Sequence, residues 1–301
     1  MQVLIIGAGG FLGSGVSRRV AAAGHNVLAL ARTPEKAAQF DQLGYGSVIG
    51  DFAGSALLDA ADRADAVINC ASIPFDQEWP SVAPILDRLR GSQKPFVQTT
   101  GTAVLSIETP NGEWREETFA EDDPFTPPPW IAVRTETEAR VRAAAAEGVR
   151  AMVVRPPMIW GHGGSAQIPA IIDSVRTTGA ACYVGSGLNL YSHVHVDDLG
   201  DLYRLTLEVG APGALYHSVA GEICWRSVAE AVGQAHGRAA RSVTLEDAKR
   251  IWGDFRGPLF FGVSSRSRSP RSRTELGWTP KHVDVLTDVL SGSYRPANDA
   301  D

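Results

Sequence analysis

The first half of the chain alternates short apolar runs with segments of helical spacing, and this alternation constrains the fold more than any other feature. Six runs rich in Val, Ile and Leu predict strands at residues 2–6, 26–31, 46–49, 66–70, 95–99 and 150–155. Helical spacing occupies stretches between them, such as 12–23 and 136–147. Strands that alternate with helices predict an α/β fold of the Rossmann type, with a doubly wound parallel sheet. Ligands bind such sheets at the carboxyl ends of the strands, so functional residues are expected in the loops that follow the strands.

The composition is that of an ordinary globular protein. Apolar residues make up 44% and charged residues 21% of the 301 positions, which excludes disordered and fibrous classes. No apolar run approaches the roughly 20 residues of a membrane span, and the net charge of −6 argues against general nucleic-acid binding. Three distant cysteines, Cys70, Cys182 and Cys224, argue against a disulfide framework or a closed zinc site. We therefore expect a cytoplasmic monomer or homodimer that acts on a small molecule, without metal, nucleic acid or membrane.

The regular alternation stops after the sixth predicted strand, and glycine-rich loops separate the later helical stretches. We expect residues 1–160 to form the sheet domain, with a segment near 190–220 returning to it. Residues 161–189 and 221–295 are expected to form a smaller C-terminal cap over the sheet, where the substrate binds. The last residues, 296–301, are expected to be a frayed tail.

A glycine-rich loop follows the first predicted strand directly. It reads Gly7-Ala8-Gly9-Gly10-Phe11-Leu12-Gly13 and opens a predicted helix. Glycine at such positions permits a tight turn, lets backbone amides approach a pyrophosphate, and allows the helix to pack against the strand. The helix N-terminus adds aligned N–H groups that attract the anion. Because the loop lies between a predicted strand and a predicted helix, it predicts a dinucleotide site at Gly7, Gly10, Phe11, Leu12 and Gly13.

The end of the second predicted strand indicates which dinucleotide binds. Chains that bind NAD usually place a carboxylate about 20 residues after the glycines, where it holds the ribose 2′-hydroxyl. Here no Asp or Glu closes the strand, and Arg32 stands in that region instead. A guanidinium can bind the 2′-phosphate of NADP through two hydrogen bonds, although a solvent-facing arginine with no ligand would fit the same position. We expect NADP(H) to be favoured over NAD(H).

An ordered series of short motifs follows the predicted strands. After the glycine loop come Gly50-Asp51-Phe52, Asn69-Cys70-Ala71-Ser72, Thr99-Thr100-Gly101-Thr102, Arg155-Pro156-Pro157-Met158-Ile159-Trp160-Gly161, Val194-His195-Val196-Asp197-Asp198-Leu199 and Glu275-Leu276-Gly277-Trp278. Taken in this order, over nearly the whole chain, they resemble the extended short-chain dehydrogenase/reductase family, in its epimerase/dehydratase-like branch. The resemblance implies a Rossmann fold and a nicotinamide cofactor.

The resemblance also implies which residues bind the cofactor. Asp51 and Phe52 match the pair that binds adenine. Cys70 and Ala71 match the loop that passes beneath the ribose and pyrophosphate, and Thr99, at the end of the fifth predicted strand, is expected to lie against the cofactor as well.

Further matches lie where the reaction would take place. Thr100 matches the serine or threonine that hydrogen-bonds the reacting oxygen, with Thr99 and Thr102 near enough to contest the assignment. Pro156, Met158 and Ile159 match the segment beside the nicotinamide. We therefore expect Thr100 to be catalytic and the other three to contact the cofactor.

The catalytic pair departs from the family pattern. The family carries Tyr-x-x-x-Lys with a Glu four residues beyond the Lys, and here Trp130, Arg134 and Glu138 hold those positions. The four-residue spacing predicts that all three lie on one helical face. Arg134 keeps a positive charge and can donate to the nicotinamide ribose, so it is expected to be both catalytic and cofactor-binding. Trp130 cannot replace the tyrosine, because an indole N–H only donates and does not titrate usefully.

A second departure concerns the substrate. Family members that act on nucleotide sugars carry an Arg four residues before the matched His195, and Tyr191 stands there instead, which argues against a nucleotide sugar. Tyr191 is a candidate for the missing acid, as are Tyr183, His162 and His193. Tryptophans and phenylalanines of the second half suggest an apolar cap and a hydrophobic or aromatic substrate, although core packing explains them equally well.

Three functions stay open on the sequence alone. The favoured one is an NADP(H)-dependent reductase of a small organic molecule, assisted by Thr100 and Arg134. The second is a non-redox or redox-neutral isomerase, dehydratase or cyclase that keeps the nucleotide. The third is a sensor that binds NADP without catalysis. The retained threonine and the cation at position 134 favour an enzyme.

Overall fold

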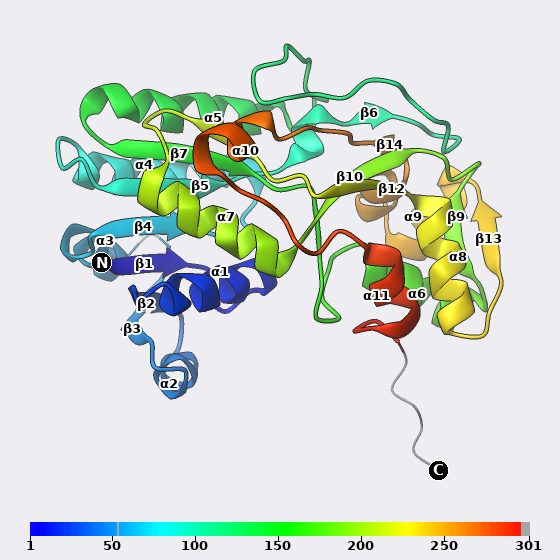
Figure 1. Ribbon diagram of the computed structural model, residues 1–301, viewed down its shortest axis with the longest axis horizontal. Helices are drawn as coiled ribbons and strands as arrows, with labels where there is room; N and C mark the ends of the chain where they lie inside the picture. Colours follow the sequence, from blue (N-terminus) through cyan, green and yellow to red (C-terminus); the bar gives the residue numbers. More distant parts are fainter. Residues whose placement is uncertain (53, 296–301) are drawn as a thin grey trace.

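Seven parallel strands form the main sheet of the computed structural model, which describes residues 1–52 and 54–295 (Figure 1). The strands are β1 (Gln2–Ile6), β2 (Asn26–Ala31), β3 (Gly46–Ile49), β4 (Ala66–Asn69), β5 (Pro95–Thr99), β7 (Arg150–Arg155) and β11 (Leu215–His217). Their order across the sheet is β11-β7-β5-β4-β1-β2-β3, and every neighbouring pair is parallel. This confirms the expected Rossmann-type α/β fold. From β1 the chain adds β2 and β3 on one side and then β4, β5, β7 and β11 on the other, so the order of the strands reverses between β1 and β4. Such sheets bind ligands at this point. The expected frayed tail, 296–301, lies outside the described residues.

Alternating side chains of the strands build a separate core on each face of the sheet. Along β1, Val3 and Ile5 belong to one apolar cluster, whereas Leu4 and Ile6 belong to the other, as the two-residue period of a strand requires. The first cluster packs against α1 (Phe11–Ala22), α2 (Pro34–Gln42) and α7 (Val196–Val209). The second packs against α3 (Ser55–Arg63), α4 (Phe75–Leu89) and α5 (Ala132–Ala143).

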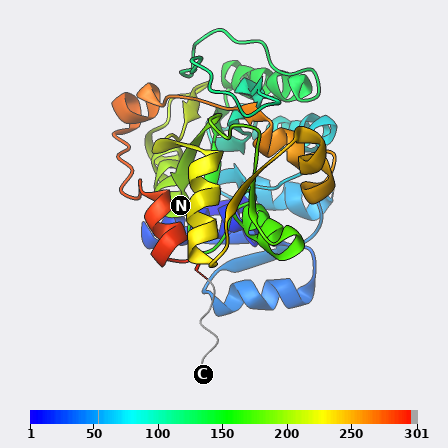
Figure 2. The same cartoon turned by 90° about the vertical axis from the view of Figure 1, so that its right-hand side faces the viewer.

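A smaller part with its own apolar core adjoins the main sheet, and Figure 2 shows it from the side. It contains a three-stranded sheet, β12-β10-β8, and a two-stranded sheet, β13-β9, while β14 pairs with β6. The strands are β6 (Ile107–Glu108), β8 (Met158–Trp160), β9 (Ala181–Val184), β10 (Leu190–His195), β12 (Gly221–Cys224), β13 (Ala240–Val243) and β14 (Val263–Ser264). The remaining helices are α6 (Ile168–Thr178), α8 (Trp225–Ala235), α9 (Leu245–Trp252), α10 (Pro270–Leu276) and α11 (Val285–Ser291), with short helical turns η1 (Thr102–Leu105), η2 (Ala144–Glu147) and η3 (Gly257–Phe261).

The chain crosses between the two parts beside the carboxyl end of the main sheet. It leaves through β7 into β8 and returns through β10 into α7 and β11 (Figure 1). Because β8 and β10 pair in parallel, the loop after β8 lies beside the start of α7. Within the described part of the chain, no helix is long and apolar enough to cross a membrane.

Candidate active site

The glycine loop after β1 forms a cradle that leaves no room for a side chain at Gly7 or Gly13. Gly7 has a φ of +84°, and a Cβ atom there would lie 2.8 Å from the backbone nitrogen of Ala71. A Cβ atom on Gly13 would lie 2.0 Å from the carbonyl oxygen of Gly7. The N–H of Gly10 donates to the same oxygen at 3.0 Å, and α1 begins at Phe11 with no acidic residue in its first turn. This cradle fits the pyrophosphate of a dinucleotide, because the first N–H groups of a helix lack partners within it.

The loop after β4 lies against the base of this cradle, and Thr99 ends β5, the strand beside β4. Ala71 donates its N–H to Asn69 Oδ1 at 3.1 Å, which holds the loop against Gly7. Burial raises the pKa of the Cys70 thiol to about 12, so this cysteine is not a reactive nucleophile. The Thr99 hydroxyl lies 2.6 Å from the Tyr203 hydroxyl. The roles that the resemblance implies for Cys70, Ala71 and Thr99 in binding a cofactor stay predictions.

Two cations lie near the carboxyl end of β2, the strand beside β1. Arg32 follows β2, is exposed, and forms no ion pair with another described residue. Lys36 lies in the first turn of α2, and its Cε atom lies 2.5 Å from the position that a Cβ on Gly9 would take. Its ammonium group donates to Gln39 at 3.0 Å. Lys36 was not among the residues predicted from the sequence, although it lies only four residues after Arg32.

Asp51 and Phe52 follow β3 at the same end. Asp51 is exposed, and Phe52 packs against the second apolar cluster. Their positions after a strand that neighbours β2 agree with a place near the adenine, and their binding role stays a prediction.

Thr100 belongs to a buried ion-pair network behind β5. Its hydroxyl donates to Glu138 Oε1 at 2.6 Å, and Arg155 Nε donates to the same oxygen at 2.9 Å. Arg155 also pairs with the other oxygen of Glu138. The structure therefore gives the Thr100 hydroxyl a partner within the protein, and its expected contact with a reacting oxygen stays a prediction.

Arg134 lies in the first turn of α5 and forms a buried ion pair that the sequence did not predict. Its Nη2 lies 2.6 Å from Oε1 of Glu78, a residue of α4. The guanidinium lies 4.9 Å from the centre of the Phe75 ring. A Cβ atom on Gly101 would lie 3.4 Å from Arg134 Nη1, so the glycine leaves room for this side chain. Burial raises the pKa of Glu78 above its ordinary value, although the charge of Arg134 acts in the opposite direction.

The position of Trp130 contradicts the expectation that it shares a helical face with Arg134 and Glu138. It lies in the turn before α5, which begins at Ala132, so only Arg134 and Glu138 share a face of the helix. The physical reason is the run of prolines at 127–129, which favours an extended path for the residues before each proline. The Trp130 side chain is 40% exposed, and its ring lies 6.5 Å from that of Phe75 and 6.3 Å from that of Phe255.

Tyr191 lies in the core of the smaller part. It is only 4% exposed, and its ring lies 5.4 Å from that of Trp225. Burial raises its pKa to about 12, against a smaller opposite effect of a hydrogen bond with Ser265. Neither Thr100 nor Arg134 is among its hydrogen-bond or ring partners within the described residues. The structure therefore does not bring the expected catalytic residues Tyr191, Thr100 and Arg134 into contact.

The segment after β7 turns toward both parts of the molecule. The carbonyl oxygen of Pro156 accepts the N–H of Thr102 at 3.0 Å, which ties it to the loop after β5. Met158 is buried in the core of the smaller part, whereas Ile159 packs against the first cluster of the main sheet, as does Leu12. Their contacts with a nicotinamide stay predictions.

The loop after β8 reaches the start of α1. A Cβ atom on Gly164 would lie 2.4 Å from the ring of Phe11, so the loop passes directly over this residue. The chain of the smaller part therefore covers the edge of the glycine cradle, beside the position that the sequence assigns to the pyrophosphate.

An apolar pocket of about 410 Å³ lies between the smaller part and the turn before α5. Trp130 and Phe255 form part of its wall, with Leu245, Leu259 and Val263. Its charged lining residues are Glu108, Lys249 and Asp254. Trp130 packs beside Phe75, and Phe75 lies over the guanidinium of Arg134, so these aromatic contacts link the wall of the pocket to the buried ion pair.

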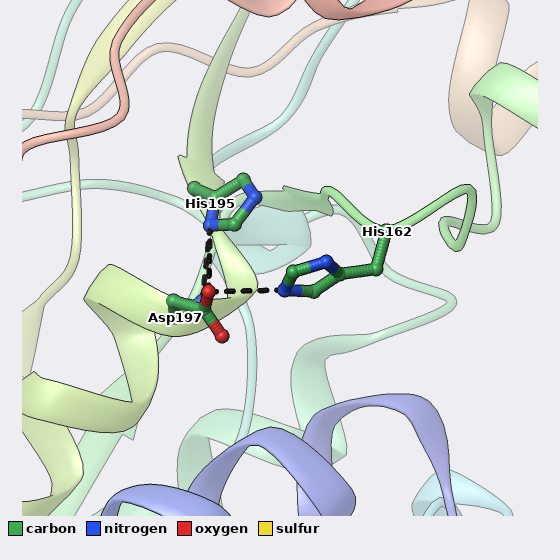
Figure 3. A group of neighbouring side chains, drawn as sticks. All are labelled: His162, His195 and Asp197. Atoms are coloured by element: carbon green, nitrogen blue, oxygen red, sulfur yellow. Dashed lines mark hydrogen bonds and ion pairs between the residues drawn. The ribbon is translucent and has the colours of Figure 1, made fainter. Parts of the chain in front are cut away.

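A cluster of histidines marks the start of α7 (Figure 3). His195 Nδ1 accepts the N–H of Asp197 at 3.2 Å and so caps the helix, and His162 Nε2 lies 2.9 Å from Asp197 Oδ2. The ring of His282 stacks on His195 at 4.3 Å. The donor atoms of His162, His195 and Asp197 lie within 4.8 Å of one another, as in a metal site. A metal on His195 Nδ1 would compete with the helix cap for one lone pair, so the cluster is better described as a clamp between the two parts.

Comparison with known proteins decides the family. The sequence pattern of the NAD-dependent epimerase/dehydratase family matches residues 3–218. The chain belongs to this family. The match reaches all seven strands of the main sheet and the return through β10, α7 and β11, and it supports a nicotinamide cofactor for this chain.

Individual relatives of the family show both the similarity and its range. An uncharacterized protein of Schizosaccharomyces pombe is 31% identical over 305 residues, which cover 98% of this chain and 100% of its own. The 2-alkyl-3-oxoalkanoate reductase of Stenotrophomonas maltophilia is 29% identical over 71% of this chain and 67% of its own. Among solved structures, the dTDP-glucose 4,6-dehydratase of Bacillus anthracis in complex with NAD has a TM-score of 0.75 at 17% identity, over 98% and 96% of the two chains. At that identity the likeness concerns the fold alone.

Proposed function

We propose that this family member is an NADP(H)-dependent reductase that acts on a carbonyl group of a small hydrophobic or aromatic molecule. The observation that carries the proposal is the position of Arg134, a largely buried cation beside the loop after β5, which carries Thr100. A cation in a poorly hydrated site stabilises negative charge that develops on a carbonyl oxygen. The similarity to a 2-alkyl-3-oxoalkanoate reductase supports the same kind of substrate.

The residues of the cradle would hold the cofactor. The glycines Gly7, Gly10 and Gly13 leave space for the pyrophosphate at the start of α1. Arg32 and Lys36 would bind the 2′-phosphate, which NAD lacks. When bound, the reduced nicotinamide supplies a hydride to the substrate.

The residues of the reaction end would bind the substrate and stabilise its charge. Arg134 would donate hydrogen bonds to the nicotinamide ribose and to the carbonyl oxygen, and Thr100 would assist. Trp130 holds no proton that titrates near neutral pH. Arg134 would therefore stabilise the alkoxide that hydride addition forms, and the alkoxide would take its proton from water to give the alcohol. We expect Arg134→Ala to lower kcat/KM more than about 100-fold, with Thr100→Val between that variant and Trp130→Phe.

The pocket beside Trp130 supports the substrate class. Its volume of about 410 Å³ lies in the range that small organic ligands fill. The aromatic walls formed by Trp130 and Phe255 favour a flat or apolar molecule, whereas a nucleotide sugar would present a charged diphosphate.

Cofactor preference is the first test. Calorimetry should show NADPH binding at least about tenfold tighter than NADH, the effect of one charge-assisted contact. Arg32→Asp should erase or invert the preference. Equal affinities in the unmodified protein would contradict the NADP assignment.

Turnover is the second test. A panel of hydrophobic and aromatic ketones is mixed with protein and NADPH, and the absorbance of the reduced nicotinamide is followed. A substrate-dependent decrease supports the reductase. Tight NADPH binding with no decrease for any carbonyl compound would favour a redox-neutral enzyme or an NADP sensor instead.

A further inference from the structure

Glu78 is a buried carboxylate whose placement needs a reason. It belongs to α4 and is only 1% exposed, and the other acidic residue in the first turn of that helix, Asp76, is exposed. A buried carboxylate is costly unless it is paired. Oε1 of Glu78 is paired with Arg134, whereas Oε2 is buried and has no hydrogen-bond partner among the described residues. Glu78 is therefore a buried carboxylate that has a partner for only one of its two oxygens among the described residues.

The guanidinium of Arg134 is held on two sides by α4. Glu78 fixes Nη2, and the ring of Phe75 covers one face. The side chain of Arg134 is 14% exposed, and Nη1 forms no hydrogen bond within residues 1–52 and 54–295. Nη1 lies beside Gly101, which has no side chain to occupy it. Nε is buried and also has no partner among the described residues, so Nη1 is the unpaired group that the structure places beside the loop after β5.

The carboxylate of α5 that could pair with Arg134 already has other partners. Glu138 lies one helical turn away on α5, which is the ordinary spacing for an ion pair. Both of its oxygens are engaged by Arg155, and one of them also by Thr100. The two cations thus have separate anions, and the partner of Arg134 comes from a different helix.

We propose that Glu78 is a positioning residue, which with Phe75 fixes the guanidinium of Arg134 so that its free N–H groups bind the nicotinamide ribose and the substrate oxygen. The inference rests on the proposed function, since it assigns to Arg134 the contacts proposed above. It assigns to α4 a part in the reaction end of the site. Glu78 touches neither ligand and acts through Arg134 alone.

A double-mutant cycle on NADPH affinity tests this role without any turnover. Fluorescence titration gives the NADPH dissociation constant of the wild type, Glu78→Gln, Arg134→Lys and the double variant. We expect each single variant to bind about tenfold more weakly or worse. The double variant should bind no more weakly than the weaker single one, because Glu78 acts only through Arg134. Independent, multiplying losses would overturn the proposal.

Two further variants separate positioning from a general effect of charge or folding. Glu78→Asp keeps the carboxylate and should recover part of the affinity that Glu78→Gln loses. Asp76→Asn removes an exposed carboxylate from the same helix and should leave NADPH affinity unchanged within about twofold. An equal loss in Asp76→Asn and Glu78→Gln would show a long-range charge effect and overturn the proposal.

Buried single variants can fail to fold, so an apolar pair completes the design. Glu78→Leu/Arg134→Met replaces both charges at similar volume, an exchange that buried ion pairs often tolerate. Its NADPH affinity should equal that of Arg134→Met, and wild-type affinity in this pair would overturn the inference. If the wild type binds NADPH but reduces no carbonyl compound, the proposed function fails while the cycle still decides the role of Glu78. Absence of NADPH binding by the wild type would overturn both.

Discussion

The two ends of the proposed cofactor site are built in different ways. At the adenosine end the cradle is made of backbone, and side chains at Gly7 or Gly13 would overlap neighbouring main-chain atoms. At the reaction end the geometry depends on side chains of two helices, Glu78 of α4 and Arg134 of α5. A backbone cradle accepts only glycine, so it leaves a visible pattern in the sequence. An ion pair between helices leaves no such pattern, because the sequence alone does not show which of several carboxylates pairs with the arginine.

The largest effect should come from filling the cradle at Gly13. In Gly13→Val the first side-chain atom would lie 2.0 Å from the Gly7 carbonyl oxygen, so the main chain of the loop must move. We expect the free energy of unfolding to fall by about 4 kcal/mol or more and NADPH binding to be lost. Urea denaturation and fluorescence titration measure the two effects.

Gly10→Val is the matched control for that change. A Cβ atom on Gly10 would lie 3.4 Å from the Gly7 carbonyl oxygen and has no closer neighbour, so the fold should survive. The valine methyl groups would enter the space assigned to the pyrophosphate, and NADPH affinity should fall at least about tenfold. Normal NADPH binding by Gly10→Val would show that the loop is not the cofactor site.

Acid should destabilise the fold through His217, which adjoins the buried network behind β5. His217 Nδ1 lies 2.9 Å from the Arg268 carbonyl oxygen, and its Nε2 lies 3.4 Å from Arg155, the partner of Glu138. Burial, and secondarily the charge of Arg155, lowers the pKa of His217 to about 3. In the unfolded chain this histidine has a pKa of about 6.5. Between about pH 6.5 and 3 the unfolded chain therefore binds a proton on His217 that the folded chain does not bind. The contribution of His217 to the free energy of unfolding is therefore fully present above about pH 6.5 and is lost progressively as the pH falls toward 3.

The slope is the measurable quantity. Below about pH 6, His217 should contribute about 1.4 kcal/mol of lost unfolding free energy for each pH unit. Urea denaturation at pH 7, 6, 5 and 4 gives this slope, and His217→Gln should reduce it by that amount. Identical slopes in the wild type and the variant would show that the histidine does not carry the effect.

The sequence predicted the main sheet closely because its signals are local. All six predicted strands are present, and the fourth ends at Asn69, one residue before its predicted end. Alternating Val, Ile and Leu are sufficient for a strand that is buried on both faces. The smaller part was not resolved into elements, since its strands are short and pair with segments far away in the chain, as β6 does with β14.

The reaction end was only half predictable for the same reason. Arg134 and Glu138 were found from their spacing within one helix, and Trp130 was wrongly placed on it because the effect of the preceding prolines was not weighed. Glu78 has no local signal that separates it from Asp76, and only the packing of α4 against α5 selects it. Residues that act across two helices require the fold before they can be named.

A moderate effect is expected from the second cation of the adenosine end. Lys36→Gln removes one charge near Gly9 and keeps most of the side chain that packs there. NADPH affinity should fall about fivefold, as for an exposed ion pair, and NADH affinity should not change. Calorimetry with both cofactors measures this, and equal losses for the two would assign Lys36 to the loop's structure instead of the 2′-phosphate.

The smallest effect should come from Trp130, although it stands where the family carries its tyrosine. Its indole N–H makes no hydrogen bond to another described residue, and its ring only contributes an aromatic wall beside Phe75 and Phe255. Trp130→Phe keeps that wall, so kcat should change by less than about tenfold, with any larger change in KM for bulky substrates. Steady-state kinetics on Trp130→Phe and Arg134→Ala with the same ketone make the comparison. If Trp130→Phe abolished turnover while Arg134→Ala had no effect, the reaction end would centre on the exposed aromatic pocket, and the buried ion pair would be structural.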